Sequence, residues 1–260
     1  MIKILKIIGV YINILTVYRF QFISNFIVQL FQLILVIFIW EAIYTGNTQN
    51  IQGYTKNDMI TYIFLVTFIG IVMNISFIFR QAKHIKDGQL SHFLIRPLSY
   101  ILDLFSIFIS QKIIELLIFI LVISLLIALN VIDDLNFSWY SLLYFPLSLI
   151  LFFYFCKAFG DMTFWLVHVW PLKPLFNSLF LLFGGGFFPL DILPTALFSV
   201  LQYTPFALFG FVNIQIIMGE VSLSKFVIYI IVTVAWLVFF ILLEKFLWNK
   251  GMKKYEGIGL

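Results

Sequence analysis

Long apolar stretches, each close to 20 residues, follow one another along most of this chain. About 20 apolar residues in a helix span the ~30 Å hydrocarbon core of a bilayer. The 260 residues are 63% hydrophobic and only 11% charged, whereas a soluble globular protein has about 25% charged residues. Such a chain cannot cover its surface with polar groups in water. The sequence therefore predicts an all-α integral membrane protein, with one transmembrane domain over residues 1–260.

We predict six transmembrane helices, at about residues 22–44, 59–79, 100–129, 139–159, 174–188 and 226–247. The fifth of these ends in an unusual run, in which three glycines, Gly184–Gly186, and two prolines, Pro189 and Pro194, break a regular helix. The apolar stretch 195–219 is long enough to cross once, but Pro205 and Gly210 interrupt it. We interpret residues 184–223 as an outer re-entrant segment, with two short helices that dip into the outer leaflet and return.

Basic residues distinguish the two sides of this topology. Of the 16 Lys and Arg residues, 13 fall on one side, Lys56 and Lys225 on the other, and Lys112 within a span. Cytoplasmic loops carry the excess of positive charge, so we predict that both termini are cytoplasmic. If residues 195–219 crossed fully, the four lysines at the end of the chain would lie outside, against this rule.

The first 19 residues combine lysines with apolar residues that share one helical face. This pattern predicts an amphipathic helix on the inner membrane surface. A frayed start of the first span is the alternative. A signal peptide is disfavoured because Arg19 follows the apolar run and no small-residue cleavage site is present.

Residues 80–99 are the only strongly charged stretch between the apolar segments. This stretch contains four basic residues and one acidic residue, Asp87. Apolar residues in the same stretch indicate a short amphipathic helix that docks into a partner's groove, with a bend at Gly88 and a stop at Pro97. A loop that only fixes orientation is the alternative. The predicted docking residues are Lys83, Lys86, Gly88, Leu90, Phe93, Leu94, Arg96 and Pro97.

Lys112 and Glu115 are the sharpest charged feature inside a predicted span. Three residues apart on a helix, they share a face, and charges in the membrane are costly and usually functional or paired. They form either a substrate or proton relay site or, as we favour, a structural pair that neutralises itself.

Enzyme chemistry is not evident in the sequence. It contains no GxxxxGK[ST] phosphate loop and no GxSxG elbow. The three histidines are scattered without metal-ligand spacing, and Cys156 is the only cysteine, so no internal disulfide can form. We therefore expect no catalytic residues, no metal and no bound cofactor in this chain.

Two segments resemble a known family. The first, KDGQLSHFLIRPLS (residues 86–99), is similar to the G-x-L…L-x-R-P-L loop of type-2 ATP-binding-cassette (ABC) exporter permeases, most closely the small six-span branch. The second, GGGFFPLDILPTALFSVLQYTPF (residues 184–206), resembles the outer segment of that branch. The three consecutive glycines depart from its pattern, in which one or two are expected.

This resemblance implies a permease that pairs with a second copy or a sister permease in a bacterial cell membrane. Separate ATPase subunits would bind ATP and Mg and dock on residues 80–99, which would act as a coupling helix. The resemblance implies export of an unspecified substrate. We expect no nucleic-acid partner, because the small net charge of +4 is explained by the basic cytoplasmic loops. An outer gate would consist of Gly184, Gly185, Gly186, Phe187, Phe188, Pro189, Leu190 and Asp191.

Two other classes of protein remain open. A self-sufficient secondary transporter or channel would need charged groups repeated across several spans, and only the third predicted span has a clear pair. A lipid-modifying membrane enzyme would need a convergent polar site, and none is apparent in the sequence.

Overall fold

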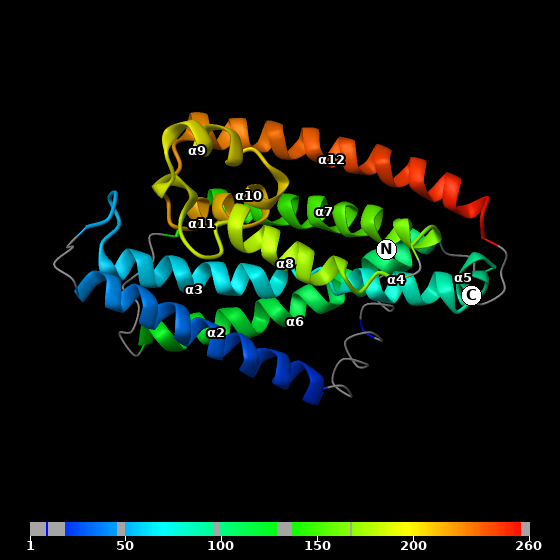
Figure 1. The fold of residues 1–260 in the computed structure, drawn as a ribbon, viewed down its shortest axis with the longest axis horizontal. Helices are drawn as coiled ribbons and strands as arrows, with labels where there is room; N and C mark the ends of the chain where they lie inside the picture. Colours follow the sequence, from blue (N-terminus) through cyan, green and yellow to red (C-terminus); the bar gives the residue numbers. More distant parts are fainter. Residues whose placement is uncertain are drawn as a thin grey trace.

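Long helices run along the long axis of the computed structural model (Figure 1). The structure describes residues 9, 19–45, 50–95, 99–128, 137–166 and 168–255. Within these ranges every regular element is a helix, which confirms the predicted all-α class. The predicted amphipathic helix at residues 1–19 lies almost wholly outside them.

The long helices are α2 (Arg19–Thr45), α3 (Lys56–Val72), α4 (Phe77–Lys86), α6 (Tyr100–Ala128), α7 (Tyr140–Asp161) and α12 (Leu223–Met252). The α3 and α4 helices continue one another and act as a single rod, Lys56–Lys86. The short helices are α5 (Leu90–Leu94), α8 (Leu172–Phe183), α9 (Thr195–Leu201), α10 (Pro205–Phe209) and α11 (Phe211–Ile217), with 3-10 turns η1 (Met162–Phe164) and η2 (Leu190–Ile192).

Four helices in the described part of the chain are long and apolar enough to cross a membrane: Lys56–Lys86, Tyr100–Ser124, Tyr140–Phe164 and Leu223–Met252. The bent pair Thr195–Leu201 and Pro205–Ile217, which turns by 75°, would make a fifth if it were one span. The apolar part of α2, Phe31–Thr45, and the helix α8 are shorter. The structure thus confirms several spanning helices, and the count of six stays a prediction.

Of the six predicted spans, the fifth, at residues 174–188, differs most from the structure. Its helix, α8, has 12 residues and is therefore about 18 Å long at 1.5 Å per residue, well short of the hydrocarbon core. The irregular segment that follows continues toward the end of the bundle, with Gly184, Gly185 and Pro189 buried. Non-helical backbone is tolerated at membrane depth where protein covers it.

The α7 helix forms the centre of the bundle, and α12, α4 and α11 pack against it. Its phenylalanines Phe152 and Phe155 are buried and contact the rings of Phe176 and Phe209. The α3–α4 rod and α7 are mostly buried, whereas α6 and α12 present most of their apolar surface outward. An outward apolar surface suits lipid as the surrounding solvent.

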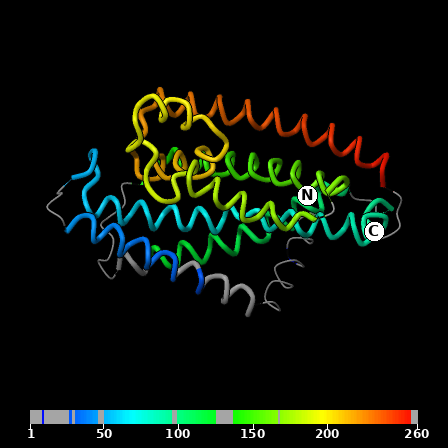
Figure 2. Tube along the Cα trace, in the orientation of Figure 1, coloured from blue at the N-terminus to red at the C-terminus, as the bar shows by residue number. Residues whose placement is uncertain are grey.

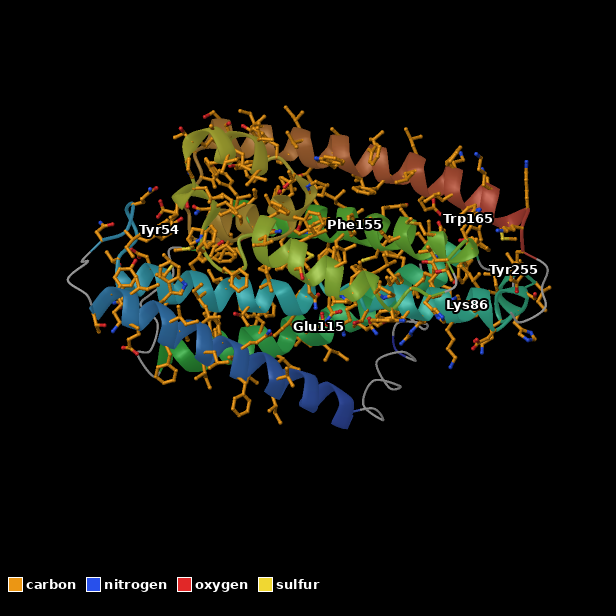
Figure 3. All side chains as sticks on the ribbon, in the orientation of Figure 1. Tyr54, Lys86, Glu115, Phe155, Trp165 and Tyr255 are labelled. Carbon is orange, nitrogen blue, oxygen red and sulfur yellow. The ribbon has the colours of Figure 1, made fainter. Side chains whose placement is uncertain are left out.

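The two ends of the bundle differ in character (Figures 2 and 3). We call the end formed by residues 80–95 and 244–255 the basic end; Figure 3 labels Lys86 and Tyr255 there. We call the other end, formed by residues 50–55, 184–194 and α9–α11, the glycine-rich end. At that end α3 begins with a capping box in which Thr55 and Asp58 bind each other's backbone N–H groups, as this residue pair is known to do at helix starts.

Candidate functional site

The segment predicted as a coupling loop is mostly helical. The α4 helix carries the chain to Lys86, and α5 begins at Leu90 after a tight turn. Gly88 makes this turn at a φ of 71°, a left-handed conformation that glycine adopts at little cost at a helix C-terminus. The backbone N–H of Asp87 closes α4 on the carbonyl of Lys83. Gly88 therefore forms the bend that the sequence predicts.

Apolar residues after the bend divide into buried and exposed ones. Leu90 is completely buried, so it supports α5 from inside and is not on a surface that a partner can reach. Phe93 is half-buried, whereas Leu94 and Ile95 are 46% and 82% exposed. The apolar surface of this segment is thus a small tip at the end of α5.

Basic residues flank the tip on the preceding helix. Lys83 is exposed and Lys86 is half-buried. Two more predicted docking residues, Arg96 and Pro97, lie outside the described part of the chain. The docking role of the predicted residues stays a prediction. The exposed part of the segment is an apolar tip beside basic side chains.

An aromatic stack holds this segment to the rest of the bundle. The imidazole of His84 stacks on Phe93 at 4.4 Å between ring centres, and Phe93 meets Tyr100 edge-on at 5.6 Å. Tyr100 stacks on Trp248 of α12 at 5.3 Å, and its hydroxyl lies 3.2 Å from His84 Nδ1. The position of α5 therefore depends on α4, α6 and α12 together.

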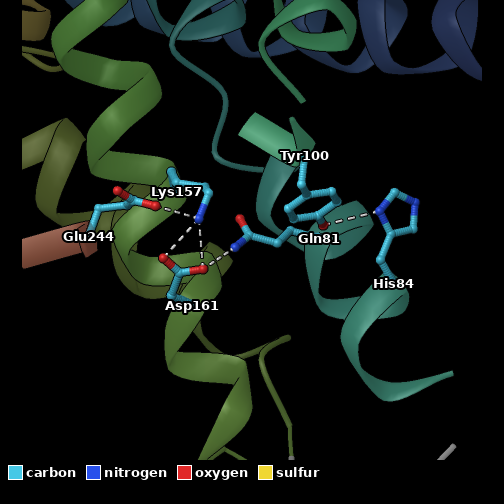
Figure 4. A network of polar contacts seen from close by, with 6 residues as sticks. All are labelled: Gln81, His84, Tyr100, Lys157, Asp161 and Glu244. Atoms are coloured by element: carbon cyan, nitrogen blue, oxygen red, sulfur yellow. Dashed lines mark hydrogen bonds and ion pairs between the residues drawn. The ribbon is translucent and has the colours of Figure 1, made fainter. Parts of the chain in front are cut away.

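A buried ionic network lies behind the stack (Figure 4). The ammonium of Lys157 lies 3.0 Å from both carboxylate oxygens of Asp161 and 2.8 Å from Oε1 of Glu244. The three side chains are 1%, 0% and 11% exposed. Gln81 Nε2 donates a hydrogen bond to Asp161, and the Lys157 ammonium also sits 4.2 Å from the ring centre of Trp248.

This network joins three helices that carry the basic end. Gln81 belongs to α4, Lys157 and Asp161 to α7, and Glu244 to α12. One ammonium is shared between two carboxyl groups, which compete for it. Removing one partner of such a buried group leaves an uncompensated charge, which costs far more than the intact group contributes. The network therefore holds the three helices in one arrangement.

Sequence reasoning missed the network. Lys157 and Asp161 lie inside the bundle, four residues apart on one face of α7. That spacing within an apolar helix was the available signal. Glu244 and Gln81 gave none, because their partners are 87 and 80 residues away in the chain.

Gly160 makes room for this network, and its replacement gives a prediction. An added Cβ at this position would collide with the side-chain amide of Gln81. Gly160→Ala is expected to push the amide off Asp161 and lower the free energy of unfolding by about 1–3 kcal/mol. Thermal unfolding of the purified protein in detergent measures the change.

The double variant Gly160→Ala with Gln81→Ala separates crowding from other effects. If Gln81 is the group that is crowded, truncating it should relieve most of the cost of Gly160→Ala, and the two changes should not add. Simple additivity would contradict this assignment, because independent sites add.

The predicted intramembrane pair forms as expected on α6. Lys112 Nζ lies 2.9 Å from Glu115 Oε2, and their side chains are only 3% and 14% exposed. The ammonium also lies 5.4 Å from the ring centre of Phe108. The carboxylate compensates the lysine within one helix turn, as a self-neutralising pair requires. A relay role for the pair stays untested.

At the glycine-rich end, the backbone of the predicted outer gate packs closely against side chains and backbone of neighbouring helices. The hydroxyl of Tyr62 donates a hydrogen bond to the carbonyl of Gly185 at 2.8 Å. The backbone N–H of Phe211 donates one to the carbonyl of Gly184, also at 2.8 Å. Gly185 has a φ of 82°, and a Cβ there would strike the Tyr62 hydroxyl. A Cβ on Gly210 would strike the Gly184 carbonyl. These close approaches explain the run of glycines.

Polar contacts fasten the rest of this segment. Tyr54 donates to Asp191 Oδ2 at 2.9 Å, and Gln215 of α11 donates to the Tyr54 hydroxyl. The indole of Trp40 donates to the carbonyl of Phe187 at 3.1 Å. Burial raises the pKa of the Asp191 carboxyl, and the hydrogen bond from Tyr54 opposes that rise. The segment is thus tied to α2, to the α2–α3 connection and to α11.

The described residues contain no group of three or more His, Cys, Asp or Glu side chains that would hold a metal ion. The candidate functional site has three parts: an exposed apolar tip, a buried ionic network and, at the opposite end of the bundle, a tightly packed glycine segment.

Comparison with known proteins adds one family. Residues 26–259 match the sequence model of the family described as ABC-2 family transporter protein. A search of curated proteins found no match to the chain. The family match covers both segments on which the resemblance in sequence depended.

Proposed function

Because the chain belongs to the ABC-2 family of transporter proteins, we propose that it is the membrane-spanning permease subunit of an ATP-driven exporter. The ATPase, with its ATP and Mg, resides in separate subunits that dock at the basic end, on the cytoplasmic side of a bacterial membrane. A second permease, identical or a sister chain, completes the pathway for the substrate.

The exposed tip of α5 is the observation that carries this proposal. Leu94 and Ile95 stand in a segment whose other side is fixed by the buried Leu90 and by the aromatic stack. An apolar tip on a rigid base, flanked by Lys83, fits a groove in a soluble partner. Charges around it would steer and orient that partner.

The mechanism follows from the two ends of the bundle. Nucleotide-driven closure of the ATPases pushes α5, and α4 moves with it as one rod with α3. A two-state arrangement of helices, biased by nucleotide, then alters the packing of the glycine segment around Gly185. The substrate leaves past Phe187, which is 44% exposed. Export is favoured over import by the family resemblance of the sequence.

A double variant tests the docking site. Leu94→Glu with Ile95→Glu should lower, at least tenfold, the vanadate-sensitive ATP hydrolysis that co-purifies with the chain in mild detergent. In the complex the two apolar side chains would be buried against the ATPase, and the variant places charges in that contact. Both side chains are exposed, so the permease itself should fold and elute normally on size exclusion.

The matched control places the same change at the opposite end. Leu197 and Val200 of α9 are 55% and 68% exposed, and Leu197→Glu with Val200→Glu should leave co-purifying hydrolysis unchanged. ATP hydrolysis that stays with the tip variant, or that never accompanies the parent chain, would refute the proposal.

A carrier that works alone is the second candidate, and the structure offers one observation in its favour. Buried charged residues occur not only on α6 but also on α7 and α12, as ion-driven transporters require. The present arrangement is mutually neutralised, which favours a structural role. Substrate uptake or release by the purified chain in liposomes without any ATPase would establish this alternative.

A further inference from the structure

The last helix, α12, is fastened to the α4–α5 turn by a single tyrosine. Tyr255, three residues beyond the helix, accepts a hydrogen bond from the N–H of Ser91 at 3.2 Å and donates one to the carbonyl of Gly88 at 2.9 Å. Its oxygen also lies 3.0 Å from the Ser91 hydroxyl. One phenol group thus fixes the turn that leads to the exposed tip.

The same helix is fastened to the bent pair at its other end. Tyr229 donates from its hydroxyl to Gln202 Oε1 at 3.0 Å, and the indole of Trp236 donates to the carbonyl of Tyr203 at 2.9 Å. Gln202 and Tyr203 form the turn between α9 and α10. These two hydrogen bonds attach the α9–α10 turn to this part of α12.

Between these two attachments α12 is an unbroken rod. It has 30 residues, about 45 Å at 1.5 Å per residue, and its sequence contains no proline and only one glycine, Gly251, near its end. Helices kink mainly at proline, glycine or inserted side chains. Figures 1 and 2 show it running from the glycine-rich end to the basic end along one side of the bundle.

We propose that α12 transmits the displacement of the α4–α5 turn to the α9–α10 turn, with Tyr255 and Tyr229 as the positioning residues at its two ends. This inference rests on the proposed function, since it assumes that a nucleotide-driven partner displaces the tip. Because Glu244 binds Lys157, α7 would move together with α12. Coupling through a shared rigid element needs two discrete arrangements that both ends sense.

Cysteine labelling at the glycine-rich end tests the proposal in the solubilised permease–ATPase complex. Ser199 of α9 is exposed, and the native Cys156 is fully buried, so Ser199→Cys provides one exposed thiol among the described residues of the permease chain, whose labelling is read from its own gel band. Its rate of reaction with a maleimide is measured with and without ATP, Mg and vanadate. Tyr255→Phe, which keeps the ring, should reduce the nucleotide-dependent change in rate about three- to tenfold. ATP hydrolysis is recorded in the same samples, so that loss of the ATPase is distinguished from loss of transmission.

Two further variants make the outcome specific. Tyr229→Phe should reduce the change in the same way, whereas Tyr140→Phe, whose hydroxyl makes no hydrogen bond among the described residues, should leave it intact. A full nucleotide-dependent change in both the Tyr255 and Tyr229 variants would overturn the role of α12 alone. A parent complex without ATP hydrolysis would instead contradict the proposed function, and this inference with it.

Discussion

Lys157→Met is expected to destabilise the protein by about 3–5 kcal/mol, because it leaves two carboxyl groups facing each other without their shared cation. The ammonium they lose lies within 3.0 Å of both Asp161 and Glu244. Thermal unfolding in detergent, with the fraction of monodisperse protein on size exclusion, should show the loss.

A charge-free version of the network should recover most of that stability. When Lys157→Met is combined with Asp161→Asn and Glu244→Gln, no charge remains in this network, and such replacements are often nearly neutral. Lys245→Met is the matched control, since Lys245 follows Glu244 on α12 but is exposed. A Lys157→Met protein as stable as this control would show that the network does not hold the helices together.

Gly185→Ala is expected to be the second severe substitution, with a loss of about 3 kcal/mol in the free energy of unfolding. The methyl group strikes the Tyr62 hydroxyl, and the residue must keep a φ of 82° that alanine rarely adopts. In a Tyr62→Phe background, which lacks both the obstructing oxygen and its hydrogen bond to Gly185, the same Gly185→Ala change should cost only about 1–2 kcal/mol, the cost of the left-handed backbone.

Gly70→Ala supplies the control for this pair. Gly70 lies inside α3, where a Cβ would meet Phe180 at an ordinary 3.5 Å. Alanine is favoured over glycine in a helix by about 1 kcal/mol, so this variant should be as stable as the parent or more so. Equal effects of Gly70→Ala and Gly185→Ala on unfolding would contradict the packing described for the glycine segment.

Features that depend on local sequence could be predicted well. Apolar length alone predicted spans at about residues 59–79, 100–129, 139–159 and 226–247, and each of them overlaps a helix that is long and apolar enough to cross a membrane. The bend at Gly88 and the pairing of Lys112 with Glu115 were also expected, because a glycine's backbone freedom and a spacing of three residues act within one or two helical turns.

Features that depend on tertiary contacts could not be predicted from the sequence. The same periodicity places Leu90 and Leu94 on an amphipathic segment, but only packing decides that Leu90 is buried and Leu94 is exposed. The α8 helix ends at Gly184, where the glycine run stops a regular helix, but the hydrogen bonds from Tyr62 and Phe211 to these glycines join residues far apart in the chain and could not be predicted. Likewise, Glu244 finds Lys157 across 87 residues of chain.

Sidedness of the tip is the most direct test of the central claim, that a soluble ATPase works this permease from the basic end. Ile95→Cys places a thiol where the side chain is 82% exposed, and the native Cys156 is buried. Ser224→Cys, also exposed, marks the opposite end. A membrane-impermeant maleimide should label Ser224→Cys in intact cells and Ile95→Cys only in inside-out vesicles. Labelling of Ile95→Cys in intact cells would place the tip outside, beyond the reach of any cytoplasmic ATPase, and contradict the account.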